Sequence, residues 1–140
     1  MYLNEDTINK IIDYSLKIIK PYLVYIFGSA VNGNFNEDSD IDIAFLSDEE
    51  FTDYEVFIMA QELADIVKRD VDLINLKKAS TVFKAQVVGT GEKIYCTDET
   101  RRMYFEMRAF KEYALLNEER EIIMENIKKR GSVYGKWCDL

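Results

Sequence analysis

The sequence contains no histidine, two cysteines and a single proline among its 140 residues. Without histidine, the chain cannot build a serine–histidine–aspartate triad, a histidine-ligated zinc site or an imidazole acid–base catalyst. The cysteines, Cys96 and Cys138, have no metal-type spacing and make no disulfide framework. We therefore expect a reduced, cytoplasmic protein whose chemistry depends on carboxylates and metal ions.

Basic residues and long apolar runs are also scarce. The chain has 18 Lys and Arg against 26 Asp and Glu, which gives a net charge of −8. Because phosphate backbones are held mainly by Lys and Arg, this balance argues against stable binding to nucleic acid. No stretch approaches the ~20 apolar residues of a membrane-spanning helix, and the N-terminus has no basic leader. Neither nucleic acid nor a membrane is an expected partner.

Helical and strand-like segments alternate along most of the chain. Asn4 or Asp6 is the expected cap of the first helix and Ser80 that of a later one, which Gly89 and Gly91 should end. The predicted elements are helices at 4–20, 54–68 and 80–88, a short helix from Ser29, and strands at 23–27, 40–46, 71–76 and 93–96. This order predicts a single α/β (α+β) domain.

Residues 98–130 form one long charged stretch without Gly or Pro, which predicts a long C-terminal helix. We favour a helix that packs along its own domain and keeps a charged face in solvent. The alternative interpretation is a docking surface for another protein. The tail at 131–140 shows no periodicity, so no structure is predicted for it.

The segment 28–42 reads GSAVNGNFNEDSDID and points to chemistry. Successive side chains of a strand alternate between its faces, so Asp40 and Asp42 should share one face while Ile41 and Ile43 occupy the other. Two neighbouring carboxylates suit Mg²⁺, which completes its coordination with water and substrate phosphates. One face of the strand is therefore predicted to carry the functional site and the other to belong to the core.

Gly28 and Ser29 follow a buried strand-like run and precede the predicted short helix. Glycine lets a phosphate approach the backbone, and the first amides of a helix attract anions. The Ser29 hydroxyl can donate a hydrogen bond to a phosphate oxygen. These two residues are thus the predicted phosphate-binding part of the site.

The Gly-Ser pair, the spacer and the Asp-X-Asp pattern resemble the signature of the DNA polymerase β-like nucleotidyltransferase superfamily, in which a third carboxylate lies on a neighbouring strand. The resemblance covers about residues 22–76 and implies that Asp72, in VDLINL, is this third carboxylate. The short chain looks most like the minimal nucleotidyltransferases, which often act as antitoxins beside HEPN-type RNase toxins. It implies a small mixed sheet flanked by helices at 1–97, with the helix and tail at 98–140 in the same domain.

The resemblance also implies a reaction. Asp40, Asp42 and Asp72 would be the catalytic residues and the Mg²⁺ ligands, while Gly28 and Ser29 would bind the phosphates of ATP. By the same resemblance, AMP would pass to a hydroxyl, that of a tyrosine on a cognate HEPN toxin. The chain cannot itself be that toxin, because the HEPN motif contains histidine.

Two departures from the family pattern affect how tightly the site should bind triphosphate. The family often has arginine directly after Gly-Ser and again two positions later, where this chain has Ala30 and Asn32, although Gly33 matches. Triphosphate binding should be weaker, or a partner should supply an arginine. Glu37 and Asp38 are assigned to a solvated loop rather than to the site.

Two other functions stay open from the sequence. One is a small-molecule nucleotidyltransferase of the aminoglycoside-modifying kind. The other is a noncatalytic antitoxin that neutralises its partner by binding through the long helix. The clustered carboxylates argue against the second, because acids without a function would only repel one another.

Overall fold

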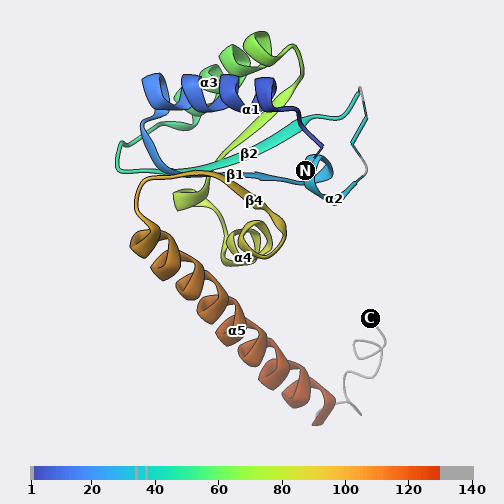
Figure 1. Ribbon diagram of the computed structural model, residues 1–140. Helices are drawn as coiled ribbons and strands as arrows, with labels where there is room; N and C mark the ends of the chain where they lie inside the picture. The colour runs from blue at the N-terminus through green and yellow to red at the C-terminus, as the bar shows by residue number, and fades with distance from the viewer. Residues whose placement is uncertain (1, 34, 37, 130–140) are drawn as a thin grey trace.

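The computed structural model describes residues 2–33, 35–36 and 38–129, so Glu37, Cys138 and the tail lie outside the described residues. A four-stranded mixed sheet in the order β3-β2-β1-β4 is flanked by helices (Figure 1). The strands are β1 Pro21–Phe27, β2 Ile41–Ser47, β3 Val71–Asn75 and β4 Glu92–Cys96. The helices are α1 Glu5–Tyr14, the π-turn η1 Ser15–Ile19, α2 Ser29–Asn32, α3 Asp53–Val67, the 3₁₀ turn η2 Leu76–Lys78, α4 Thr81–Thr90 and α5 Glu99–Lys129. The predicted α/β (α+β) fold with a long C-terminal helix is confirmed.

The pairing of the strands brings one face of the sheet to a functional edge. β1 runs antiparallel to both β2 and β4, whereas β2 and β3 are parallel and joined through α3. In this register Asp42 lies opposite Phe27 on one side and opposite Asp72 on the other. Register partners point to the same face of a sheet. The end of this face therefore carries two acids and an aromatic ring side by side.

Helices cover both faces of the sheet. On one face α1 and α3 bury a core that includes Ile11, Ile43 and Leu63. On the other face α4 and the start of α5 bury a second cluster around Ala44, Leu46 and Val87. The alternation within β2 predicts that the whole face of Asp42 belongs to the functional site. The structure shows that much of this face belongs to the core instead. Helices α4 and α5 pack over the middle of this face, which leaves its ends open.

The helix starts follow from their capping residues. The Asn4 side chain accepts a hydrogen bond from the Thr7 amide at 2.8 Å, and Ser80 accepts one from the Phe83 amide at 3.1 Å. Both predicted caps are confirmed. The first predicted helix is helical to Ile19, but it changes from α-helix to the π-helix η1 after Tyr14. The end of α4 is confirmed at its C-cap Gly91, whereas the prediction that Gly89 also ends the helix is wrong. Gly89 stays helical because it packs against α5 there.

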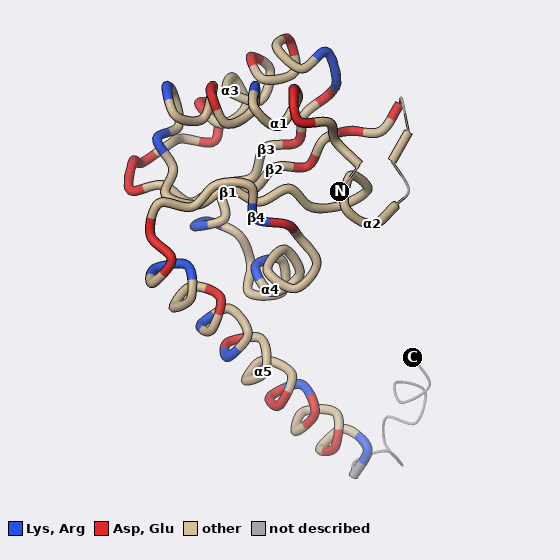
Figure 2. Tube along the Cα trace, viewed as in Figure 1, with Lys and Arg blue, Asp and Glu red and all other residues tan. Residues whose placement is uncertain are grey.

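The long helix α5 has two unlike halves. Near its start the Tyr25 hydroxyl donates to Glu106 at 2.6 Å, and Arg102 donates to the same carboxylate at 2.9 Å, which fixes the helix to the sheet. Farther along, α5 projects away from the sheet (Figure 1), and residues of both charges recur along it (Figure 2). Several of its apolar side chains there are exposed, among them Leu115, Ile122 and Ile123. The favoured interpretation, a helix packed along its own domain, holds only for the first half.

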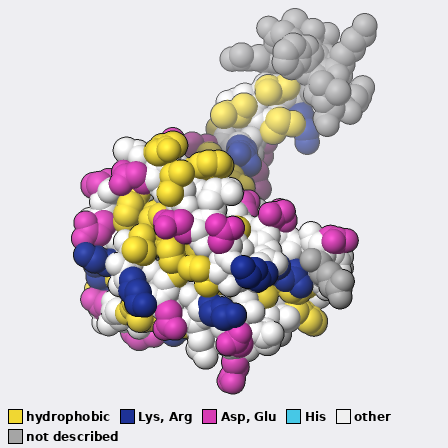
Figure 3. All heavy atoms as spheres, turned by 90° about the horizontal axis from the view of Figure 1, so that it is seen from above, with side chains coloured by type: hydrophobic (Ala, Val, Ile, Leu, Met, Phe, Trp, Pro, Cys, Tyr) yellow, Lys and Arg dark blue, Asp and Glu magenta, His cyan; other side chains and the backbone are white. Residues whose placement is uncertain are grey.

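The opposite, α1–α3 side carries apolar side chains among charges of both signs (Figure 3). Exposed apolar residues there include Leu16 and Ile18 of η1 and Tyr54 and Phe57 of α3.

Within the described part of the chain, no helix is both long and apolar enough to cross a membrane.

Candidate active site

The three predicted carboxylates come together at one end of the sheet. Asp42 and Asp72 are register partners on the parallel strands β2 and β3, and Asp40 lies just before β2 rather than inside it. Burial, and then the negative charges of Asp72 and Asp40, raise the pKa of Asp42 to about 6. Asp40 and Asp72 are exposed and Asp42 is half-buried. The structure thus brings the carboxylates within electrostatic reach of one another, with Asp42 at the centre.

These carboxylates have no cation beside them. Among the residues that the structure describes, none of the three forms a hydrogen bond or an ion pair, and no group of three or more Cys, Asp and Glu side chains is placed to hold a metal ion by itself. Clustered carboxylates without a cation repel one another, and a bound divalent ion would relieve this repulsion. Hard oxygen donors fit Mg²⁺, which usually takes only one or two carboxylates and completes its shell with water and phosphate oxygens.

Gly28 occupies a tight turn directly against Asp42. Its φ of 71° lies in a region that side chains disfavour, and a Cβ at this position would collide with the Asp42 carboxylate. The amides of Val31 and Asn32 donate to the Gly28 carbonyl oxygen, which closes the turn. Only glycine allows the backbone to pass so close to the carboxylate. A phosphate held at this turn would therefore lie next to the acids.

Ser29 begins α2, as predicted, but this helix is only four residues long. Such a short helix has little dipole, so phosphate binding here depends on the Gly28 turn and the Ser29 hydroxyl instead. The side chain of Ala30 is fully buried in the core. The first position where the family often has arginine is thus occupied by a small side chain that packs in the core. Asn32, at the second such position, is exposed.

A cavity of ≈ 290 Å³ adjoins the Gly28 turn on the face of Asp42. Sequence reasoning did not find it, because its walls come from segments far apart in the chain. It is lined by Phe27, Gly28, Asn32, Phe83, Gln86, Val87 and Thr90.

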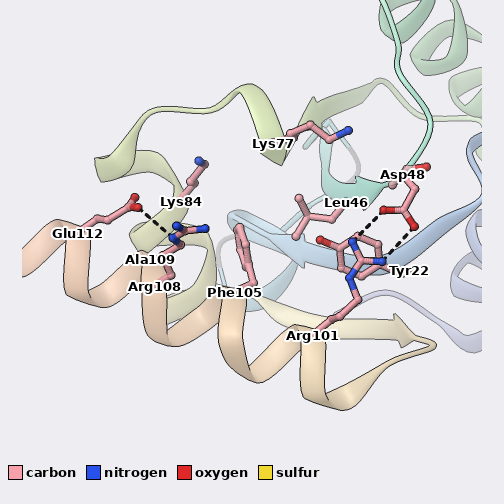
Figure 4. Close-up of a pocket in the computed structure, with 11 residues that line it drawn as sticks. Tyr22, Leu46, Asp48, Lys77, Lys84, Arg101, Phe105, Arg108, Ala109 and Glu112 are labelled. Atoms are coloured by element: carbon pink, nitrogen blue, oxygen red, sulfur yellow. Dashed lines mark hydrogen bonds and ion pairs between the residues drawn. The ribbon is translucent and has the colours of Figure 1, made fainter.

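A second cleft lies at the opposite end of the same face, where β2 ends and α5 begins (Figure 4). Here Arg101 donates to both oxygens of Asp48, at 2.8 and 3.0 Å, and its guanidinium lies 3.6 Å from the centre of the Tyr22 ring. These hydrogen bonds hold the pKa of Asp48 below its usual value. The charges of this cleft are largely neutralised within the protein, unlike those around Asp42.

Comparisons with known proteins agree with this geometry. The family model described as polymerase beta, nucleotidyltransferase matches residues 9–100. The chain is 34% identical over 125 residues to the protein adenylyltransferase MntA of Shewanella oneidensis, covering 89% of this chain and 88% of that protein.

Two solved structures are similar throughout. A crystal structure of a toxin–antitoxin complex with AMP-PNP contains a chain that is 35% identical, with a TM-score of 0.76 and coverage of 86% of this chain and 98% of that one. A structure of a tri-AMPylated Shewanella oneidensis HEPN toxin with its MNT antitoxin contains a chain that is 32% identical, with a TM-score of 0.73 and coverage of 90% and 99%.

Proposed function

This chain belongs to the polymerase β nucleotidyltransferase family, and on that premise we propose that it transfers AMP from ATP to a tyrosine hydroxyl of a HEPN toxin and thereby acts as an antitoxin. The observation that carries the proposal is the group of carboxylates around Asp42, which pair with no cation among the described residues and of which Asp42 lies against the Gly28 turn. The related MNT antitoxin occurs in a complex with a tri-AMPylated toxin, which supports the choice of acceptor.

Each residue of the site has a role in this reaction. Asp40, Asp42 and Asp72 would hold Mg²⁺, and Gly28 and Ser29 would hold the outer phosphates of ATP. A bound Mg²⁺ supplies positive charge against the phosphates and lowers the pKa of a hydroxyl beside it. The acceptor oxygen forms a bond to the α-phosphorus, and the bond from that phosphorus to pyrophosphate breaks. Asp72 would hold the metal ion nearer the acceptor hydroxyl or accept its proton, and its exposure supports this role.

The outer half of α5 is the proposed contact surface for the toxin. Its exposed apolar residues include Leu115, Ile122 and Met124, and no other described part of the chain packs over them. Exposed apolar side chains grouped on a helix that leaves its own domain favour contact with another protein. The same surface could serve an antitoxin that only binds, so the two functions must be separated by experiment.

The test is to mix the chain with Mg²⁺, α-labelled ATP and the HEPN protein encoded beside it, and to repeat the mixture with Asp42→Asn. We expect label on the toxin and loss of its RNase activity, and neither with the variant. Neutralisation without label, surviving in the variant, would show a binding antitoxin. Label found only on amino sugars offered in parallel would show a small-molecule enzyme.

A further inference from the structure

We propose that Arg69 is a positioning residue of the metal site, because it fixes the chain segment that leads into Asp40. Arg69 lies between the end of α3 and the start of β3, three residues before Asp72. In this role it contacts the backbone of the segment before Asp40 rather than a metal ion or a substrate. The inference rests on the proposed function, because it concerns the carboxylates that would hold Mg²⁺ in that reaction.

Asp40 is the one of the three acids that the sheet does not hold in place. Asp42 and Asp72 are register partners on β2 and β3, so the hydrogen-bonded pairing of these strands sets their separation. Asp40 lies in the segment between α2 and β2, just before the first residue of the strand. It therefore needs contacts outside the sheet to stay at a fixed distance from the other two acids.

Arg69 makes three contacts with the segment that precedes Asp40. One nitrogen of its guanidinium, Nη1, donates to the carbonyl oxygens of Asn36 and Ser39, at 2.7 and 3.0 Å. The guanidinium also lies 4.2 Å from the centre of the Phe35 ring, which packs against the core under α1 and α3. A planar cation with several donors suits both kinds of contact. Because Ser39 directly precedes Asp40, these contacts restrict where the Asp40 carboxylate can lie.

Arg69 is itself held by the end of α3. Its backbone amide donates to the Ala64 carbonyl oxygen at 3.3 Å, and the residue is half-buried. One residue later, the Asp70 carbonyl oxygen accepts a hydrogen bond from the Ile41 amide at 2.9 Å. The chain is thus tied to the connection between α3 and β3 on both sides of Asp40, by a side chain before it and by the backbone after it.

The charge of Arg69 is directed at carbonyl oxygens rather than at the acids. Arg69 forms no ion pair within the described residues, and the charges that raise the pKa of Asp42 are those of Asp72 and Asp40. Groups that orient metal ligands affect metal affinity or activity by roughly 10–100-fold when they are replaced. Loss of Arg69 should therefore weaken metal binding by loosening Asp40, not by removing a counter-charge.

The experiment compares Arg69→Gln with a matched control, Lys68→Gln. Lys68 is the neighbouring cation, and it is exposed and forms no ion pair within the described residues. Its replacement removes the same charge from the same connection but none of the three contacts. Isothermal titration calorimetry of each metal-free protein with Mg²⁺ measures the affinity directly. Arg69→Gln should bind Mg²⁺ about ten-fold more weakly, and Lys68→Gln should match the wild type.

AMP transfer to the toxin is the second readout. In Arg69→Gln the Mg²⁺ concentration for half-maximal transfer should rise by about ten-fold, while the rate at saturating Mg²⁺ should approach that of the wild type. Arg69→Lys keeps the charge but loses the planar group, so its Mg²⁺ affinity should lie between those of wild type and Arg69→Gln. The Tm in EDTA separates this role from a purely structural one, since a structural residue would lower the Tm without changing the Mg²⁺ dependence.

Two results would overturn the inference. One is a wild-type Mg²⁺ affinity in Arg69→Gln, or in Arg69→Lys should the first variant not fold. The other is an equal loss of affinity in Arg69→Gln and Lys68→Gln, which would assign the effect to charge alone. Failure of the proposed function looks different, because the wild type would then bind Mg²⁺ and transfer no AMP to the toxin.

Discussion

The two ends of β2 carry the same kind of residue in opposite electrostatic states. At one end the charged neighbours of Asp42 among the described residues are the carboxylates of Asp72 and Asp40, and burial together with these charges raises its pKa. At the other end Asp48 is held by both nitrogens of the Arg101 fork, and its pKa is lowered. A carboxylate with a structural role is paired with a cation of its own chain. One left among like charges in a water-accessible corner is suited to bind a cation from outside.

The largest effect expected from this contrast is on catalysis. Asp42→Asn should lower AMP transfer by about 10²-fold or more, because it removes a charged ligand from the centre of the site. The same change should leave the metal-free fold at least as stable, because repulsion with Asp72 and Asp40 disappears. Initial rates with labelled ATP and thermal unfolding in EDTA measure the two effects.

The matched control is Asp48→Asn at the other end of the strand. It should leave transfer near the wild-type rate, since Asp48 pairs with Arg101 at the end of the strand away from Asp42. Equal losses of transfer in the two variants would abolish the distinction between the ends of β2.

The second effect concerns the backbone beside Asp42. Gly28→Ala should destabilise the fold by about 1–3 kcal/mol, because the left-handed φ strains any side chain and the new Cβ meets the Asp42 carboxylate. Transfer should fall as well, since the turn that faces the phosphates must shift. Chemical unfolding and transfer rates check both parts.

Gly89→Ala is the matched control for this change. Gly89 is helical, and a Cβ there would make only ordinary contacts with Phe110, at 3.8 Å or more. It should stabilise the protein by about 0.5–1 kcal/mol and leave transfer unchanged. Destabilisation of similar size by both variants would show that the Gly28 turn is not special.

A third, smaller effect is the pH dependence of the metal-free protein. The pKa of Asp42 is raised to about 6 in the folded state from an ordinary value of 3.8. The folded state therefore binds this proton more tightly than the unfolded state does. The resulting contribution to folding stability is fully present below pH 3.8 and is lost as the pH rises through 6. The Tm of the wild type in EDTA should fall, relative to that of Asp42→Asn, as the pH is raised across this window. A difference that stays constant with pH would contradict the raised pKa.

Much of the fold was predictable because local signals determine it. The caps Asn4 and Ser80, the alternation within β2 and the helix between β2 and β3 are each encoded by short-range patterns. The parallel arrangement of β2 and β3 then explains why Asp42 and Asp72 meet, as the family resemblance implied. Site residues near strand ends follow directly from such patterns.

What the sequence did not show depends on long-range packing. The burial of Ala44 and Leu46 requires α4 and α5 to lie on the face of Asp42, which no periodicity within β2 reveals. The cavity needs Phe27 and Phe83, far apart in the chain, to meet edge to face. The direction of α5 is likewise set by long-range contacts, among them the hydrogen bond between Tyr25 and Glu106 and the packing of α5 against α4. Charge patterning along a helix cannot specify that point.

The smallest expected effect lies at the paired end of the strand. Arg101→Gln removes the bidentate ion pair with Asp48 and the contact with the half-buried Tyr22 ring, but Arg101 and Asp48 are themselves exposed. Exposed ion pairs contribute little to stability and are screened by salt. The Tm should therefore fall slightly at low salt and less at high salt, with AMP transfer unchanged. Arg108→Gln is the control, because the Arg108 side chain is more exposed than that of Arg101 and its single ion pair with Glu112 is longer, at 3.5 Å, so it should matter less. A marked loss of transfer in Arg101→Gln alone would mean that the paired end also takes part in the reaction, and that internal neutralisation does not separate structural from functional carboxylates in this fold.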